Sequence, residues 1–245
     1  MAFINYIIKN RIFIFVVTFV LLFGCAALKP YRSVDLPPKT VMLTFDDGPN
    51  AHNNVTGSVL DVLKRHDIKA YFCLIGMNVE RYPSIVKRIY NEGHYLANHG
   101  YTDEFVVHKR NRDIKDDIIK CNSAIGKALE IENYRVKYYR PPRGFYRVST
   151  KKVWQELGME MLPFTLYALD AQRKGDKADV VIKETVDEVR KSNGGIIILH
   201  DGRDCEERML AEIEKDSTSS YNRFWISAAV DSIVTMLKRD GFVFK

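Results

Sequence analysis

The chain has 245 residues, of which 46% are apolar and 28% are charged, so it can bury the core of one large domain. This composition excludes a disordered chain, a collagen and a coiled coil. Lys and Arg exceed Asp and Glu by 37 to 31, but two of the basic residues lie in an N-terminal segment that we expect to be removed. The remaining net charge of +4, from 35 basic and 31 acidic residues, is weak evidence for a nucleic-acid partner, and we predict none.

The first 28 residues begin with a positively charged region and continue as an apolar run over residues 12–28. This order, ending in small residues, is typical of a secretory signal. Residues 22–25 (LFGC) resemble the lipobox of bacterial lipoproteins, in which the chain is cut before the Cys and that Cys is lipidated. We therefore predict a signal peptide over residues 1–24, a lipid on Cys25 and a place in the bacterial cell envelope, periplasmic or on the outer surface. An ordinary cleaved signal and an uncleaved membrane anchor are the alternatives.

A proline-containing tether over residues 25–39 is expected to lead into one domain over residues 40–245. In this domain, short β-branched or aromatic runs alternate with longer helical patterns. The predicted strands are residues 40–45, 69–74, 94–98, 136–140, 161–166, 195–199 and 241–244. The predicted helices are residues 58–65, 83–91, 114–129, 150–157, 178–192 and 224–239. The alternation predicts an α/β fold with a parallel sheet, either open or closed into a barrel, with ligands at the carboxyl ends of the strands.

Two of these strand ends carry side chains suited to metal and proton chemistry. Asp46 and Asp47 end the first strand, and adjacent carboxylates leaving a strand point in different directions, so one can bind a metal while the other handles a proton. A turn alone would also explain Asp47. His99 and Asp103 follow the third strand at a spacing of four, which places both on one face of a helical turn and makes them candidate metal ligands. A surface loop with one histidine is the alternative.

Two further strand ends supply an arginine and a histidine. Arg140 precedes two prolines that fix the backbone, so its guanidinium can be held against a carboxylate. His200 and Asp201 follow a wholly apolar strand, and a histidine there is suited to proton transfer near neutral pH. Polar clusters at four strand ends of a parallel sheet together predict a single site. The three remaining cysteines, Cys73, Cys121 and Cys205, lie far apart in the chain and are expected as buried free thiols, with one disulfide as the alternative.

The motifs TFDDGP (residues 44–49), NH (98–99), RPPRG (140–144) and ILHD (198–201) resemble, in this order, those of the polysaccharide deacetylases of carbohydrate esterase family 4, the NodB-like domain. The resemblance covers residues 40–245. It implies a distorted barrel of about seven β/α units, in a single α/β domain. It also implies a metal-dependent hydrolase that removes N- or O-linked acetyl groups from sugars.

The resemblance assigns catalytic roles to four residues. Asp46 matches the catalytic base, and Arg140 matches the arginine that orients this base. His200 matches the general acid that protonates the leaving group. Asp170 matches the acidic residue of the fourth motif and could keep the imidazole charged and oriented, although Ala171 stands where a tryptophan usually follows.

The metal ligands implied by the resemblance are Asp47, His99 and, where the family has a second histidine, Asp103. The backbone N–H of Arg143, where an aromatic residue is frequent, is implied as an oxyanion donor, and Leu199 is implied to line the acetyl pocket. One divalent ion per chain is expected. Zinc follows from the resemblance, whereas the extra carboxylate favours harder metals, so cobalt, nickel, manganese and iron remain candidates.

Asp103 leaves three interpretations open. It could bind the metal itself, another group such as His108 could take its place, or the site could bind metal poorly and be inactive. The favoured function is a metal-dependent deacetylase acting on an envelope or extracellular polysaccharide, as a monomer held at the membrane by its N-terminal lipid or anchor. The alternative is a catalytically impaired, glycan-binding envelope lipoprotein on the same fold. Structural roles are expected for His66 and His94.

Overall fold

The computed structural model describes residues 25–27 and 36–245 of the chain. The predicted signal peptide and residues 28–35 of the predicted tether lie outside the described residues. Residues 25–27 form β1 (Cys25–Ala27), which pairs antiparallel with β6 (Phe145–Arg147). No helix among the described residues is long and apolar enough to cross a membrane.

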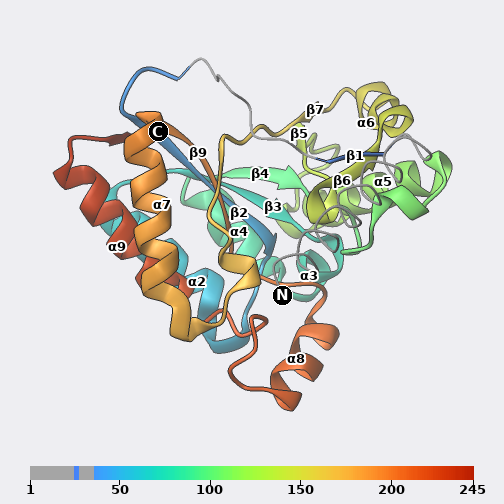
Figure 1. The fold of residues 1–245 in the computed structure, drawn as a ribbon. Coiled ribbons are helices and arrows are strands. Elements are labelled where there is room, and N and C mark those ends of the chain that lie inside the picture. The colour runs from blue at the N-terminus through green and yellow to red at the C-terminus, as the bar shows by residue number, and fades with distance from the viewer. Residues whose placement is uncertain (1–24, 28–35) are drawn as a thin grey trace, which may run out of the picture.

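A parallel sheet forms the centre of the domain (Figure 1). Its strands are hydrogen-bonded in the order β7-β5-β4-β3-β2-β9-β8, and β10 pairs with the start of β2. The strands are β2 (Thr40–Gly48), β3 (Ala70–Leu74), β4 (Tyr95–Asn98), β5 (Tyr138–Tyr139), β7 (Glu160–Met161), β8 (Leu166–Tyr167), β9 (Gly194–His200) and β10 (Val243–Phe244). Because the edge strands β7 and β8 do not pair, the sheet is a half-barrel. The predicted single α/β domain with a distorted barrel is confirmed.

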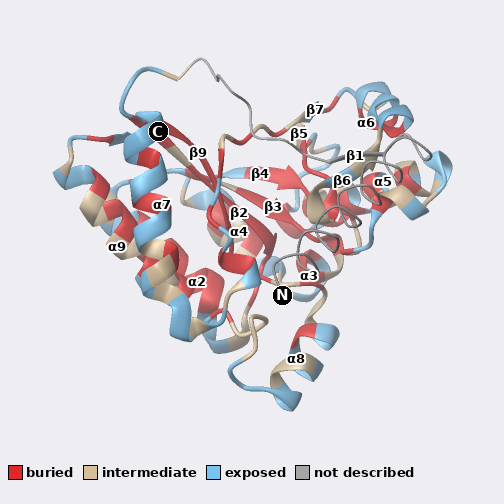
Figure 2. Cartoon of the chain, viewed as in Figure 1, coloured by how far each residue is buried: buried red, intermediate tan, exposed pale blue. Residues whose placement is uncertain are grey.

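Helices surround this sheet in two groups (Figure 1). One group packs near β2 and β9 and consists of α2 (Val55–His66), α7 (Ala178–Ser192) and α9 (Ile226–Arg239). The other packs near β3 and β4 and consists of α3 (Gly76–Arg81), α4 (Pro83–Asn91) and α5 (Asn111–Leu129). Two further helices are α6 (Lys151–Glu156), which contacts α5, and α8 (Glu206–Lys215), which follows β9 in the chain. Figure 2 shows that the helices are buried toward the sheet and exposed on their outer faces, as amphipathic spacing predicts.

The two longest strands, β2 and β9, form the buried middle of the sheet. Every residue of β9 is buried, and all but one residue of β2 are buried. Strands that are covered on both faces have nearly continuous apolar sequences, and β9 (GGIIILH) has such a sequence. Parallel pairing of β2 with β3 and β9, and of β3 with β4, brings their carboxyl ends to one edge of the sheet.

The predicted strand over residues 161–166 is wrong, because the structure divides this run into two strands at opposite edges of the sheet. Met161 ends β7, which pairs with β5, and Leu166 begins β8, which pairs with β9. Pro163 lies between them and has no N–H group to donate to a neighbouring strand. The proline therefore interrupts a run whose apolar character alone indicates one strand.

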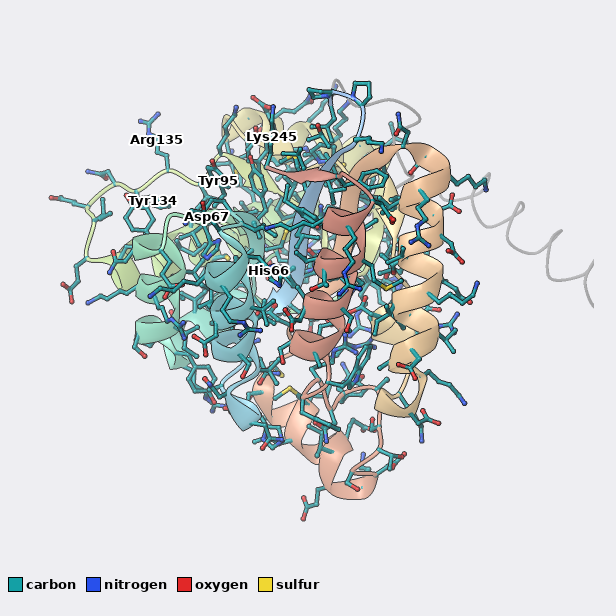
Figure 3. All side chains as sticks on the ribbon, turned by 90° about the vertical axis from the view of Figure 1, so that its left-hand side faces the viewer. His66, Asp67, Tyr95, Tyr134, Arg135 and Lys245 are labelled. Carbon is teal, nitrogen blue, oxygen red and sulfur yellow. The ribbon has the colours of Figure 1, made fainter. Side chains whose placement is uncertain are left out.

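The histidines and cysteines outside the strand ends have the expected structural surroundings. His66 ends α2 beside α9, where its Nε2 lies 2.6 Å from Oδ1 of Asp231 (Figure 3). His94 is buried and accepts a hydrogen bond from a backbone N–H at 3.2 Å. Cys73 and Cys121 are buried free thiols, as predicted, and Cys205 is also free but only partly buried.

Candidate active site

A cavity of about 350 Å³ opens at the carboxyl ends of the strands. Seven of the nine predicted site residues line it: Asp46, Asp47, His99, Asp103, Arg140, Arg143 and His200. The two aspartates at positions 46 and 47 and His200 lie at the carboxyl ends of β2 and β9, and the other four residues lie in the segments after β4 and β5. These segments meet because parallel strands end at the same edge of the sheet. Asp170 is fully buried and contacts His200, so eight of the nine residues belong to one site.

Asp46 is held by the guanidinium of Arg140. Nη1 of Arg140 donates to Oδ1 of Asp46 at 2.6 Å and to the hydroxyl of Thr44 at 2.9 Å. Nη2 of Arg140 donates to the carbonyl oxygen of Pro163 at 3.1 Å. Both members of the pair are almost completely buried, at 4% and 1% exposed. Because buried charges need a partner, the ion pair holds the Asp46 carboxylate in place at the cavity.

His200 is oriented by Asp170. Its Nδ1 lies 3.0 Å from Oδ1 of Asp170, and its backbone N–H donates to Oδ2 at 2.9 Å. Burial lowers the pKa of His200, but the charge of Asp170, with those of Asp47 and Asp46, raises it above its usual value. Asp170 therefore favours the charged form of the imidazole and leaves Nε2 as the available nitrogen.

A buried arginine, Arg223, binds both members of this pair and lies outside the sequence motifs described above. Its Nη2 donates to Oδ2 of Asp170, its Nη1 to the Asp170 carbonyl at 3.0 Å, and its Nε and Nη2 to the His200 carbonyl at 3.3 and 3.1 Å. Burial raises the pKa of Asp170, but the charges of His200 and Arg223 outweigh this effect and leave that pKa below its usual range. Arg223 thus keeps Asp170 ionised beneath the imidazole.

Asp47 and His99 form the second pair of the site. Nε2 of His99 lies 3.2 Å from Oδ1 of Asp47, and Nδ1 donates to the carbonyl of Arg140 at 2.8 Å, which fixes the tautomer and the ring orientation. Burial opposes charge on both groups, yet the contact between them lowers the pKa of Asp47 and, with the charge of Asp46, raises that of His99. Both side chains are buried at the cavity.

Asp103 lies in the same cavity but is bound to Arg143. Nη2 of Arg143 donates to Oδ2 of Asp103 at 2.7 Å and to Oδ2 of Asp204 at 3.0 Å, and Nε donates to the Asp103 carbonyl at 3.0 Å. The other carboxylate oxygen of Asp103, Oδ1, is buried and has no hydrogen-bond partner. Burial and the charge of Asp47 raise the pKa of Asp103 to about 7, against the effect of Arg143.

These residues fit a divalent cation by their chemistry, although the three donors are not gathered around one point. Asp47 and His99 are adjacent, and the unpartnered Oδ1 of Asp103 is a third oxygen of the kind that hard or borderline metals accept. Among the residues that the structure describes, however, no three His, Cys, Asp or Glu side chains are arranged to hold a metal ion. A metal ion bound by Asp103 would therefore share this carboxylate with Arg143.

The acetyl-pocket residue expected from sequence is wrong by one position. Leu199 is completely buried in the main hydrophobic core and does not line the cavity. Ile198 and Phe164 line the cavity and pack together in a separate small cluster. Successive side chains of a strand point to opposite faces, so the neighbour of His200 at position 199 points away from the cavity and Ile198 points into it.

Aromatic side chains surround the cavity mouth and were not predicted as site residues. Phe105, Phe145 and Tyr167 line it and remain 39%, 47% and 42% exposed. Phe105 and Phe145 lie 6.1 Å apart between ring centroids, and the guanidinium of Arg143 lies over Phe105 at 5.2 Å. Exposed aromatic rings beside a polar cavity offer flat surfaces for the apolar faces of sugar rings.

The family model for polysaccharide deacetylase matches residues 33–162, more than half of the chain. The chain belongs to the polysaccharide deacetylase family. A chitooligosaccharide deacetylase of Sinorhizobium fredii is 30% identical over 84% of this chain and 89% of its own length. A peptidoglycan N-acetylglucosamine deacetylase of Bacillus cereus is 33% identical over 70% of this chain, which spans 57% of that relative's length.

Solved structures of polysaccharide deacetylases share the fold. A peptidoglycan N-acetylglucosamine deacetylase has a TM-score of 0.67 at 29% identity, with 85% of this chain and 86% of that chain covered. A pseudoenzyme of carbohydrate esterase family 4 from Bacillus anthracis has a TM-score of 0.65 at 26% identity, with 84% of this chain and 63% of that chain covered. The fold of this family is therefore shared by active and inactive proteins.

Proposed function

We propose that this polysaccharide deacetylase hydrolyses N- or O-linked acetyl groups on a glycan of the bacterial cell envelope or its surroundings. One observation carries the proposal: a carboxylate held by an arginine and an imidazole held by a carboxylate face the same cavity. The distances are 2.6 Å for Arg140 to Asp46 and 3.0 Å for Asp170 to His200. A base and an acid, each fixed by a buried partner, are what acyl transfer to water requires.

In the proposed reaction, Asp46 removes a proton from a water molecule while the oxygen of that water forms a bond to the acetyl carbon. The backbone N–H of Arg143, in the turn after the two prolines, donates to the developing oxyanion. The bond from the acetyl carbon to the sugar nitrogen or oxygen then breaks, and Nε2 of His200 gives its proton to that leaving atom. The products are acetate and a free amine or hydroxyl on the sugar.

We further propose that a divalent cation binds at Asp47 and His99, with Asp103 as the third donor. Such an ion would supply Lewis-acid polarisation of the acetyl carbonyl and would lower the pKa of the attacking water. Zinc, cobalt, nickel, manganese or iron would suit this donor set. Two matched variants test the assignment, because Asp103→Asn and Asp204→Asn each remove a carboxylate that pairs with Arg143. We expect lower metal occupancy, measured by elemental analysis of purified protein, only for Asp103→Asn. Unchanged occupancy in that variant would exclude Asp103 as a ligand.

The substrate class is proposed from the cavity mouth together with the relatives. The exposed rings of Phe105, Phe145 and Tyr167 provide stacking surfaces for sugars. Relatives are named as peptidoglycan N-acetylglucosamine, peptidoglycan N-acetylmuramic acid and chitooligosaccharide deacetylases. We therefore propose an acetylated polysaccharide of this kind as the substrate.

A second function, glycan binding without hydrolysis, is supported by the ion pair between Asp103 and Arg143 and by the resemblance to a pseudoenzyme. The two functions are separated by measuring acetate release from acetylated chitooligosaccharide, peptidoglycan and acetylated xylan, with each candidate metal added in turn. We expect release on at least one substrate and none from Asp46→Asn. If metal-loaded protein binds these glycans but releases no acetate, the hydrolase is refuted and the binding protein is retained.

We also propose that the mature chain is a monomer anchored to the membrane through a lipid on Cys25. The support is the LFGC sequence at residues 22–25. Metabolic labelling with a radioactive fatty acid should label the wild-type chain and not Cys25→Ser, which should move to the soluble fraction after cell lysis. Labelling of both chains would show that the lipid is attached at another residue.

A further inference from the structure

The cavity contains three arginines, and two of them are neutralised by carboxylates. Arg140 pairs with Asp46 at 2.6 Å, and Arg143 pairs with Asp103 at 2.7 Å. Arg203 also lines the cavity, but within the described part of the chain no Asp or Glu lies within ion-pair distance of it. Among the described residues, its charge therefore has no direct carboxylate partner.

Arg203 is nevertheless held in place. Its Nη1 donates to the carbonyl of Ala171, another cavity residue, and its guanidinium lies over the ring of Tyr221 at 5.1 Å. These contacts use one nitrogen and one face of the group. A guanidinium has five N–H groups in a planar fork, so donors remain for a ligand. An immobilised arginine with unused donors is preorganised for an anion.

The position of Arg203 relates it to the reacting groups. It follows His200 by three residues in the loop after β9, and it lines the same cavity as Asp47 and Tyr167. Two other arginines, one close to Ala171 in sequence and one in α8, behave differently, since Arg173 pairs with Glu184 at 2.7 Å and Arg208 with Asp204 at 3.0 Å. Structural arginines in this region have carboxylate partners, and Arg203 does not.

We propose that Arg203 is a subsite for a carboxylate carried by the glycan substrate, close to the acetylated sugar; this proposal rests on the proposed function. The planar carboxylate matches the fork of the guanidinium, which pairs with it through two parallel hydrogen bonds. A phosphate carries up to two charges and would be repelled more strongly by Asp46, Asp47 and Asp103, which line the same cavity. The carboxylate could belong to a lactyl ether, as on a muramoyl sugar, or to a uronic acid.

The test uses pairs of acetylated oligosaccharides of equal length, in which the carboxylate is free or converted to its amide. One pair carries a lactyl ether and the other a uronic acid, so the result also identifies the source. For each pair, the ratio of kcat/KM for the free acid over the amide is measured from acetate release by the full chain. Any general loss of activity cancels in this ratio.

We expect the wild type to prefer the free acid of one pair, and Arg203→Gln to lower that preference about 10- to 100-fold, which is the strength of a charge-assisted hydrogen-bonded pair. Arg203→Lys should retain part of it, since lysine keeps the charge but lacks the fork. Arg173→Gln is the matched control and should keep the full preference. Equal ratios in the wild type and Arg203→Gln would overturn the proposal while leaving the deacetylase intact, whereas absence of acetate from every substrate would refute the proposed function itself.

Discussion

Replacement of Arg223 by methionine tests whether the buried network beneath His200 is as important as its geometry indicates. Arg223 and Asp170 are both 0% exposed, and the guanidinium donates four hydrogen bonds to Asp170 and to the His200 carbonyl. Methionine fills similar space without charge or donors. Asp170 would then be a buried carboxylate whose only remaining cation is the imidazole of His200.

Breaking a buried ion pair by removing one partner lowers the free energy of unfolding by about 3–5 kcal/mol. For a domain of this size, the loss corresponds to a melting temperature lower by roughly 6–20 °C. Because the folded-state pKa of Asp170 is below its usual value, its pairing stabilises the wild type at neutral pH, and this contribution is lost as the pH falls through that pKa. In Arg223→Met the pKa of Asp170 rises, so the stability difference between the two proteins narrows toward acid pH.

Urea unfolding between pH 7 and pH 3, followed by tryptophan fluorescence, measures this difference, and Trp225 lies 4.7 Å from the Arg223 guanidinium. Arg190→Met provides a control, since the pair of Arg190 with Asp240 is on the surface and should contribute little. A loss below about 1 kcal/mol at pH 7 would show that the buried pair is not a source of stability. A loss that stays constant as Asp170 is protonated would show that packing, rather than charge, explains it.

Three further predictions concern the reaction. Asp46→Asn should lower kcat for acetate release by about 10²- to 10⁴-fold, and a smaller loss would mean that another group is the base. Asp170→Asn should lower the pKa of His200, which the Asp170 charge raises, so the alkaline limb of the kcat/KM profile should move to lower pH; a shift to higher pH would contradict this assignment. Ile198→Ala should increase hydrolysis of propionyl relative to acetyl groups, a ratio that Leu199→Ala should leave unchanged because Leu199 does not line the cavity.

The sequence predicts the location of the site well because only local information is needed. Asp46 and His200 lie at the carboxyl ends of apolar strands, His99 and Arg140 directly follow theirs, and parallel strands place their carboxyl ends together. Once the sheet is predicted, these residues are expected to lie close together, whatever path the loops take. The same argument predicts the α/β class from the alternation of strands and helices.

Three features were missed in the sequence for identifiable reasons. Arg223 reaches Asp170 from 53 positions away, in a loop whose path no periodicity determines. The face of β9 that lines the cavity was assigned wrongly because the apolar run itself shows no polar alternation, and only counting back from His200 indicates that Ile198 shares its face. The pairing of Asp103 with Arg143 depends on the direction in which the Arg143 side chain points, which the sequence does not determine.

The carbonyl of Pro163 accepts a hydrogen bond from Arg140 in the short segment that crosses from β7 to β8, the two unpaired edges of the sheet. The arginine that orients the base therefore also connects the ends of the incomplete barrel. A descendant of this protein that lost its chemistry would still be under selection to keep Arg140 for folding. The presence of this arginine in a family member is therefore not by itself evidence of activity.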